Sequence, residues 1–357
     1  MFSVTVSSDN RHVVSGSSDN TVRIWSVSTS GKEHVLQGHS DLVYSATVSP
    51  DNRHVVSGSS DKTVRIWNAL TGEEEHVLRG HSGSVYTVAL SSDNRHVISG
   101  SSDKTVRIWS LLTGELENVL RGHSTLVNSV TVSPDNHHVV SGSSDRTVRI
   151  WSLSTGEMEH LLQGSSGSVK TVAVSTDNCH VVSGSTDNTV RIWSLSTGEE
   201  EHVLRCHSGE VNSVAFSPDN SHIVSGSSDN TIRIWNASTG EEISTTLFVF
   251  SYFSYHVTSV HPVGEMFISS IVASIALLAQ GDSWFIPSPV IVDSIWNGLS
   301  LAPLTLTPDR SCILLSNGKK CLAIPSTLRD ITCTAFSGSK VCFGYHSGRL
   351  AILDFLT

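Results

Sequence analysis

The feature that most constrains this chain is a repeat that returns every 42 residues without an insertion. In each copy a nearly constant segment ends at a tryptophan, and that segment reads "SGSSDKTVRIW" in two of the copies. The six tryptophans are Trp25, Trp67, Trp109, Trp151, Trp193 and Trp235. A period of about 40–45 residues is typical of proteins in which one small unit buries its apolar surface against the next. We therefore expect one structural unit per repeat.

Each repeat divides into four segments of strand length. In the second repeat they read "LVYSATVS", "RHVVSGS", "TVRIWNAL" and "EEHVLRG". The turn-forming stretches "PDN", "SSDK" and "TGE" lie between them. No stretch shows a helical period over about ten residues. The pattern predicts an all-β fold built from four-stranded units.

The residues at these positions resemble those of the WD-repeat family. The marks are a Gly-His pair such as Gly38-His39, a serine on the second strand, an aspartate in the next turn and the tryptophan on the third strand. The resemblance implies a β-propeller of four-stranded blades. It covers residues 1–243 strongly, and blades this similar to one another resemble the C-terminal sensor region of fungal NACHT/WD-repeat proteins of the STAND class.

In that family the four polar side chains form a hydrogen-bonded tetrad inside each blade. A buried aspartate needs donors, and the histidine and serine supply them. The matching positions form four sets: His39, Ser57, Asp61 and Trp67; His81, Ser99, Asp103 and Trp109; His123, Ser141, Asp145 and Trp151; His207, Ser225, Asp229 and Trp235. We interpret these sets as structural rather than as catalytic Ser-His-Asp triads, because the same set recurs from blade to blade.

Several positions depart from the family pattern. Serine or asparagine follows each repeat tryptophan, where most members have aspartate. The fifth repeat has Ser165 in place of the histidine, and the sixth has Cys206 in place of the glycine. Met1 falls within the first strand of the first repeat, so the strand that customarily closes the ring is not found before Phe2. We therefore expect either an unusual closure or a piece of a longer receptor.

Two columns of the repeat change chemistry while their neighbours stay constant. In this family they face the narrower top rim, where partners usually dock. The alternative is drift of the sequence at exposed strand ends. Another column that is expected to be exposed stays uniform, however: His12, His54, His96, His138, His180 and His222. We expect the ring of varying residues to bind a protein or peptide. The two columns are Leu42, Ser84, Leu126, Ser168 and Glu210, and Tyr44, Tyr86, Asn128, Lys170 and Asn212.

The regular repeat ends near residue 243. Residues 244–300 are apolar and irregular, and we interpret them as a degenerate blade or a poorly ordered segment; sequence from a retained intron or shifted frame is the alternative. The apolar run at 266–279 is shorter than the roughly twenty residues of a spanning helix. Residues 301–357 resemble two degenerate blades. The expected propeller has eight blades, within a range of seven to nine.

The composition of the chain limits the classes of partner that it is expected to bind. A formal net charge of −10 and the absence of basic runs disfavour nucleic acid and anionic membranes. None of the six cysteines forms a C-x-x-C pair, and the last four are expected to be buried free thiols. Because the N-terminus lacks a secretory signal pattern, we expect a cytoplasmic protein.

Three functions remain to be compared. We favour a non-enzymatic binding scaffold without cofactor or metal, as the sensor part of a STAND-type receptor. A constitutive adaptor subunit of a ubiquitin ligase or a ribosome-assembly complex is the alternative. A metal-dependent propeller hydrolase is disfavoured because acidic and histidine ligands do not converge from unlike blades. The chain contains no match to G-x-x-x-x-G-K-[ST], so no nucleotide site is expected.

Overall fold

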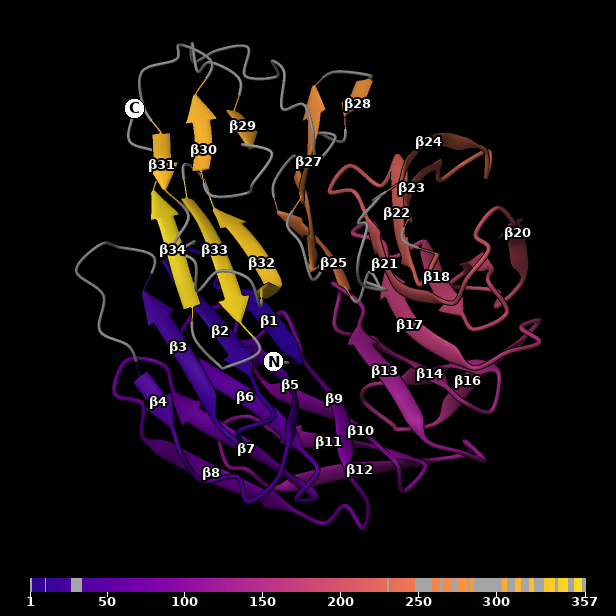
Figure 1. Ribbon diagram of the computed structural model, residues 1–357. Helices are drawn as coiled ribbons and strands as arrows, with labels where there is room; N and C mark the ends of the chain where they lie inside the picture. Colours follow the sequence, from indigo (N-terminus) through magenta and orange to yellow (C-terminus); the bar gives the residue numbers. More distant parts are fainter. Residues whose placement is uncertain are drawn as a thin grey trace.

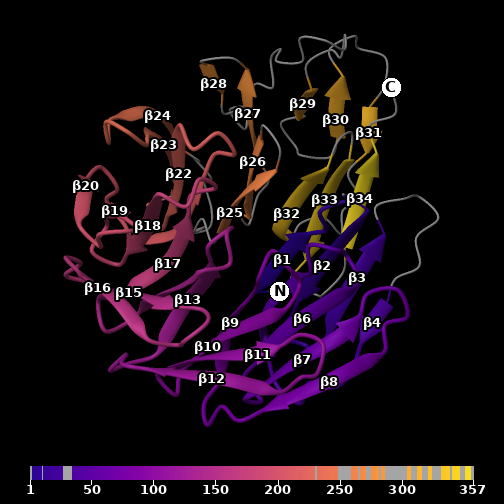
Figure 2. The same cartoon turned by 180° about the vertical axis from the view of Figure 1, so that it is seen from behind.

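The structure is a computed structural model that describes residues 2–9, 11–26, 34–229 and 231–247, followed by the backbone of separate strands between 259 and 354. Side chains are described up to residue 243. Over these residues the fold is all-β, as predicted, and contains no helix. Figure 1 shows the sheets arranged radially around a central axis, and Figure 2 shows the same ring from behind.

Six sheets of four antiparallel strands follow one another along the chain, each in sequence order. The first is β1 (Ser3–Val6), β2 (His12–Gly16), β3 (Val22–Ser26) and β4 (His34–Leu36). The second is β5 (Val43–Val48), β6 (His54–Ser59), β7 (Thr63–Asn68) and β8 (Glu74–Arg79). The third is β9 (Val85–Leu90), β10 (His96–Ser101), β11 (Thr105–Ser110) and β12 (Leu116–Arg121).

The next three sheets repeat this arrangement. The fourth is β13 (Val127–Val132), β14 (His138–Ser143), β15 (Thr147–Ser152) and β16 (Met158–Gln163). The fifth is β17 (Val169–Val174), β18 (His180–Ser185), β19 (Val190–Ser194) and β20 (Glu200–Leu204). The sixth is β21 (Val211–Phe216), β22 (His222–Ser227), β23 (Thr231–Asn236) and β24 (Glu242–Leu247), so its outer strand continues past residue 243.

Three further sheets follow. The first is β25 (Ser259–Val263), β26 (Met266–Ser270), β27 (Ile275–Gln280) and β28 (Ser283–Phe285). The second is β29 (Leu304–Leu306), β30 (Cys312–Leu315) and β31 (Cys321–Ala323), drawn farther from the centre in both views. The third is β32 (Ile331–Ser337), β33 (Lys340–Tyr345) and β34 (Leu350–Asp354).

The described strands close a ring of eight blades. Strand β25 lies against β21, while β32 lies against both β26 and β1. The pairing of β32 with β33 shifts register between Ile331 and Cys333, at the point where the innermost strands of the regular blades shift. Strand β32 therefore begins with the same irregularity as the innermost strands of blades two to six. The first blade is complete in β1–β4, so the ring closes by packing of β32 beside β1 and not by a shared sheet.

Consecutive blades meet where a constant glycine faces a constant valine. A Cβ placed on Gly58 would lie 2.7 Å from Cγ1 of Val85 on the next blade, and 3.0 Å from Cγ1 of Val88. The same contact recurs at Gly16, Gly100, Gly142 and Gly184. Because only a glycine leaves room for the valine, both columns stay constant through the repeats.

Apolar clusters fill the space between blades. In one of them Val56, Ile66 and Leu78 of the second blade pack with Val97 and Trp109 of the third. Trp109 is 1% exposed. Burial of such side chains contributes roughly 1.5–3 kcal/mol each, so every blade depends on its neighbours for its stability.

Hydroxyl groups tie the innermost strands to one another. The hydroxyl of Ser3 accepts a hydrogen bond from the amide of Ala46 at 2.9 Å. The hydroxyl of Ser45 accepts one from the amide of Val88 at 3.2 Å. Thr87 and Ser129 make the same bond to the amides of Val130 and Val172. These bonds give a hydrogen-bond partner to backbone amides that strand pairing within a blade leaves without one.

Alanine in place of Gly58 is expected to destabilise the fold by about 1–3 kcal/mol, because its methyl group overpacks the contact with Val85. Urea unfolding of G58A, V85A and the double variant measures this. If the two residues meet as described, the double variant costs less than the sum of the single variants. Additive costs would show that the blades do not meet here.

Candidate functional site

The tetrad residues come together in four blades. In the second blade Trp67 Nε1 donates to Ser57 Oγ at 2.9 Å, and His39 lies 2.8 Å from both Ser57 Oγ and Asp61 Oδ2. The Nδ1–H tautomer of His39 fits this chain of bonds, with the serine hydroxyl donating to Nε2. The blades containing His81, His123 and His207 show the same geometry.

The tetrads hold their carboxylates in the charged form. Burial opposes ionisation, but hydrogen bonds from His39 and Thr63 outweigh it and hold the pKa of Asp61 well below its ordinary value of 3.8. The same causes lower the pKa of Asp103, Asp145 and Asp229. Each carboxylate is therefore a fixed negative charge that organises the turn around it.

The serine of each tetrad is closed to any substrate. Ser57, Ser99, Ser141 and Ser225 are 0% exposed, and each accepts a hydrogen bond from its tryptophan. A nucleophile must reach a substrate carbonyl. Burial of the serine therefore excludes this arrangement from acting as a catalytic triad.

In the two described blades without a tetrad histidine, the third-strand arginine that every regular blade has lies near the tetrad aspartate. Arg23 lies 3.2 Å from Asp19 in the first blade, and Arg191 lies 3.9 Å from Asp187 in the fifth, where Ser165 replaces histidine. Arg191 is 6% exposed, deeper than its counterparts in the other blades. Asp187 also accepts hydrogen bonds from the Ser166 amide at 2.8 Å and the Thr189 hydroxyl at 2.6 Å, so it keeps donors without the histidine.

The varying column sits at a β-bulge. Val43 pairs with Ser59 and Ser45 pairs with Gly58, so Tyr44 between them has no partner. Tyr86, Asn128, Lys170 and Asn212 occupy the same unpaired position in their strands. A bulge redirects a side chain out of the ladder, and bulges are common beside functional sites. The column is therefore a repeated structural device and not a frayed strand end.

Three aromatic rings lie in a row along this column. The Tyr44 and Tyr86 ring centroids are 5.0 Å apart, and Phe2 lies 5.3 Å from Tyr44. Phe2 stands one 42-residue period before Tyr44 and is 52% exposed, but it was not among the residues predicted for the rim. Subtracting 42 from 44 would have found it. The row gives blades one to three a rigid, partly exposed aromatic surface.

The rest of the column is polar. Asn128 donates to Ser144 Oγ at 3.0 Å and to the Val169 carbonyl at 2.7 Å, and Asn212 donates to Ser228 Oγ at 2.9 Å. These two amides therefore brace the neighbouring turns. Lys170 is exposed and provides the positive charge of this column.

The first varying column supports the same edge. The carbonyls of Leu42, Ser84, Leu126, Ser168 and Glu210 each accept an amide hydrogen from the turn between the second and third strands of their blade, at 2.8–3.0 Å. Glu210 is exposed and the other four are half-buried. We call the two columns together with Phe2 the upper rim. The structure places all ten predicted rim residues and Phe2 at this one edge of their blades.

The uniform histidine column has a structural reason for its constancy. These histidines were expected to be exposed, but they are half-buried, and His54 Nε2 lies 3.3 Å from a Glu75 carboxylate oxygen. His96, His138 and His180 make the same pair with Glu117, Glu159 and Glu201. Their constancy therefore does not argue against drift on the rim, and the bulge carries that argument instead.

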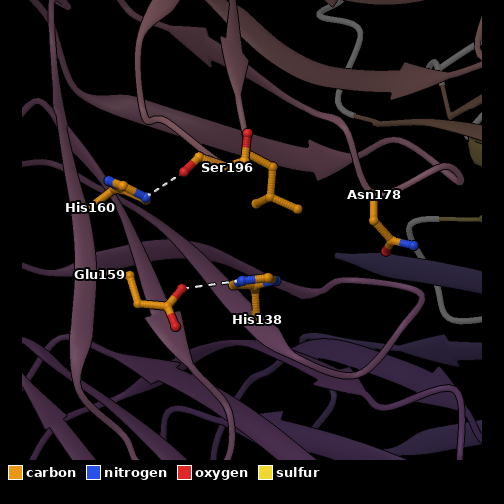
Figure 3. Close-up of a pocket in the computed structure, with 6 residues that line it drawn as sticks. His138, Glu159, His160, Asn178 and Ser196 are labelled. Atoms are coloured by element: carbon orange, nitrogen blue, oxygen red, sulfur yellow. Dashed lines mark hydrogen bonds and ion pairs between the residues drawn. The ribbon is translucent and has the colours of Figure 1, made fainter.

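A cleft of about 540 Å³ opens on the opposite edge, between the fourth and fifth blades. Figure 3 shows His138 paired with Glu159, and His160 donating to the Ser196 carbonyl, with Asn178 across the opening. His76 and His202 make the equivalent bond to Leu112 and Ser238 in other blades. Because its polar contacts recur from blade to blade, the cleft belongs to the frame.

The family profile of the WD domain, G-beta repeat, matches residues 1–26, 31–68, 72–110, 114–152, 156–194 and 198–236. These matches cover more than half of the chain and coincide with the six regular blades. The chain belongs to the WD-repeat family. A search of curated protein sequences finds no relative that matches it.

WD-repeat propellers generally serve as scaffolds that bind proteins or peptides and are not enzymes. In the described part of this WD-repeat protein no three histidine, cysteine or acidic side chains gather as metal ligands. Its described residues also include no helix long and apolar enough to cross a membrane. Cys179 and Cys206 are free and exposed, whereas Cys312, Cys321, Cys333 and Cys342 lie where side chains are not described.

Histidine in place of Ser165 is expected to stabilise the protein by about 1 kcal/mol, because Ser183, Asp187 and Trp193 already hold the other three tetrad positions. Urea unfolding tests this. The matched change His123→Ser in the fourth blade should destabilise by a similar amount or more. A destabilised S165H with intact folding would show that Arg191 has taken over the site.

The tetrads should also make stability depend on acid pH. Their carboxyl pKa values are lower in the folded chain than in the unfolded one, so the unfolded state binds protons first as the pH falls. The contribution is complete above about pH 4 and is lost progressively below it. Unfolding free energy measured from about pH 6 to about pH 3 should fall less steeply for D145N than for D41N, which lies outside the tetrads.

Proposed function

We propose that the upper rim of this WD-repeat protein is the surface that binds a protein partner. The observation that carries the proposal is the bulge, which places an aromatic, an amide or a basic side chain at the same point of blades two to six. The frame beneath that point is kept constant by the glycine–valine contact and the tetrads. Such a ring presents several side chains at fixed spacing, which suits recognition of an extended polypeptide segment.

Phe2, Tyr44 and Tyr86 are the anchor of this surface. Aromatic residues supply large area with few rotatable bonds and are enriched at interface hot spots. Contact between neighbouring rings restrains them before a partner arrives. Less conformational entropy is then lost on binding.

We propose further that this propeller is the ligand-detecting part of a STAND-type receptor in the cytoplasm. The support is the near-identity of the blades, which resemble the sensor arrays of such proteins. A constitutive adaptor of a multiprotein complex is the second candidate. Sequencing the transcript upstream of Met1 separates them: an in-frame nucleotide-binding P-loop favours the receptor, and a stop codon in that frame favours the adaptor.

The variant F2S/Y44S/Y86S tests the rim. Partner affinity should fall by about 30-fold or more, since loss of aromatic hot spots costs roughly 2 kcal/mol or more. Proteins captured on the immobilised chain and quantified by mass spectrometry identify the partner, and titration then measures its affinity.

The control variant is L70S/L112S. Leu70 and Leu112 are 84% and 83% exposed, and they lie in the turns at the opposite edge. It removes a comparable apolar surface away from the rim and should leave binding intact. Equal capture by the rim variant and the unmodified chain, with both folded, would refute the proposed surface.

A further inference from the structure

A second set of side chains stands next to the rim, in the turns between the second and third strands. Each of these turns has one residue in the left-handed region, at φ values of 68–71°. The residues are Asn20, Lys62, Lys104, Arg146 and Asn188. Asparagine tolerates this conformation better than other non-glycine residues, whereas lysine and arginine have no such preference.

The opposite edge supplies an internal comparison. Its turns also contain one left-handed residue each, at φ values of 59–60°, and all of those described are asparagine: Asn52, Asn94, Asn136, Asn178 and Asn220. There the amide oxygens accept hydrogen bonds from the preceding blade, as Asn136 does from the Ser92 amide at 2.8 Å. No such bond is described for Lys62, Lys104 or Arg146. Backbone preference alone therefore favours asparagine at the upper turns, yet three consecutive blades carry a cation.

These cations are exposed and close to the rim. Lys62 lies two residues after Ser60, whose amide donates to the Leu42 carbonyl and whose hydroxyl lies 3.2 Å from that of Ser84. Lys104 and Arg146 occupy the same position in their turns, where the preceding serine amide donates to the carbonyl of Ser84 or Leu126. The basic residues thus border the sector of the rim that contains Tyr44 and Tyr86.

A second, independent substitution adds positive charge to the same sector. In the second, fifth and sixth blades an arginine on the third strand pairs with a glutamate on the outer strand: Arg65 with Glu74, Arg191 with Glu200 and Arg233 with Glu242. In the third and fourth blades Leu116 and Met158 replace that glutamate. Arg107 has no described ion pair, and Arg149 contacts the Met158 sulfur instead.

The neighbouring acids do not cancel this difference. Asp61, Asp103 and Asp145 precede the three cations, but their side chains are 4–5% exposed and their oxygens are occupied by the tetrad. The equivalent aspartate is present in the other regular blades too, so it does not distinguish the sectors. Asp41 is an exposed acid just before Leu42 of the rim, and Glu210 lies on the sixth blade. The net charge of the chain is −10, so these three cations are a local feature of the turns of blades two to four and do not reflect the overall charge.

We propose that blades two to four of the upper rim bind a polypeptide segment that combines anionic and apolar side chains. Lys62, Lys104 and Arg146 receive the anions, and Tyr44 and Tyr86 receive the apolar groups. The inference rests on the proposed function and adds the chemical class of the partner. Carboxylate and phosphoserine share the anionic chemistry, and the experiment below distinguishes them.

The experiment uses the full chain and a phage-displayed library of random peptides, followed by titration of fluorescent synthetic copies of the retained sequences. The retained peptides should be enriched in aspartate or glutamate beside aromatic or aliphatic residues. K62N/K104N/R146N should weaken their binding by about tenfold or more, and added salt should do the same. Asparagine suits the left-handed turn, so this variant should fold at least as stably as the unmodified chain.

Two matched measurements complete the test. L116E/M158E restores the carboxylate found in the second, fifth and sixth blades and should also weaken binding, whereas L70S/L112S should not. Copies with phosphoserine in place of glutamate show whether the acceptor prefers phosphate: tighter binding assigns phosphate, and weaker binding assigns carboxylate.

The other possible results would overturn either the anionic class of the partner or the rim as its binding surface. Retained peptides without acidic enrichment, or affinity unchanged in K62N/K104N/R146N, would overturn the anionic class while leaving the rim as the binding surface. If no peptide is retained, or if F2S/Y44S/Y86S binds the retained peptides unchanged, the proposed rim function fails as well. Tighter binding of a single-stranded RNA oligonucleotide than of any peptide would assign the cations to nucleic acid.

Discussion

The structure depends on one contact, the backbone of a glycine on one blade against a valine side chain on the next. No Cβ fits between Gly58 and Val85, so the two sheets approach more closely than side chains on both faces would allow. That approach brings the innermost strands within reach of the hydroxyl of Ser45 and its equivalents. It also closes the apolar clusters around tryptophans such as Trp109. The hydrogen-bonded tetrads stabilise each blade internally, but it is this contact that makes a ring of them.

The fold could be predicted from the sequence because the repeat is free of insertions. A constant period fixed the four strands of each regular blade, and the turn residues between them fixed the boundaries. The closure could not be predicted, because packing of β32 beside β1 leaves no mark on the N-terminal sequence. Residues 244–300 show why period matters: without it, apolar segments are compatible with strands and with other structures alike.

The rim could be predicted only in part. Comparing the repeats with one another found the varying columns, but the bulge beneath Tyr44 depends on strand register and is invisible in one strand alone. Phe2 was missed because the comparison began at the Gly-His pair, which the first repeat lacks. The half-burial of the histidine column follows from Glu75 and its equivalents on the outer strand, a contact that sequence spacing does not suggest. The donors that Asp187 finds without a tetrad histidine, such as the Ser166 amide, likewise depend on the folded turn.

The uniformity of the contacts between blades has a consequence for how such a protein can change. The asparagine bonds alternate around the ring: Ser92 and Thr176 donate at two joints, whereas Asp51 and Asp135 donate at the joints beside them. The glycine–valine contact, in contrast, recurs unchanged. A regular blade therefore presents its neighbours with the same glycine on one face and the same valine on the other. Duplication, loss or shuffling of whole repeats preserves this glycine–valine contact and rearranges the order of the side chains on the rim. Recombination between repeats can thus generate new recognition surfaces without first passing through an unstable protein.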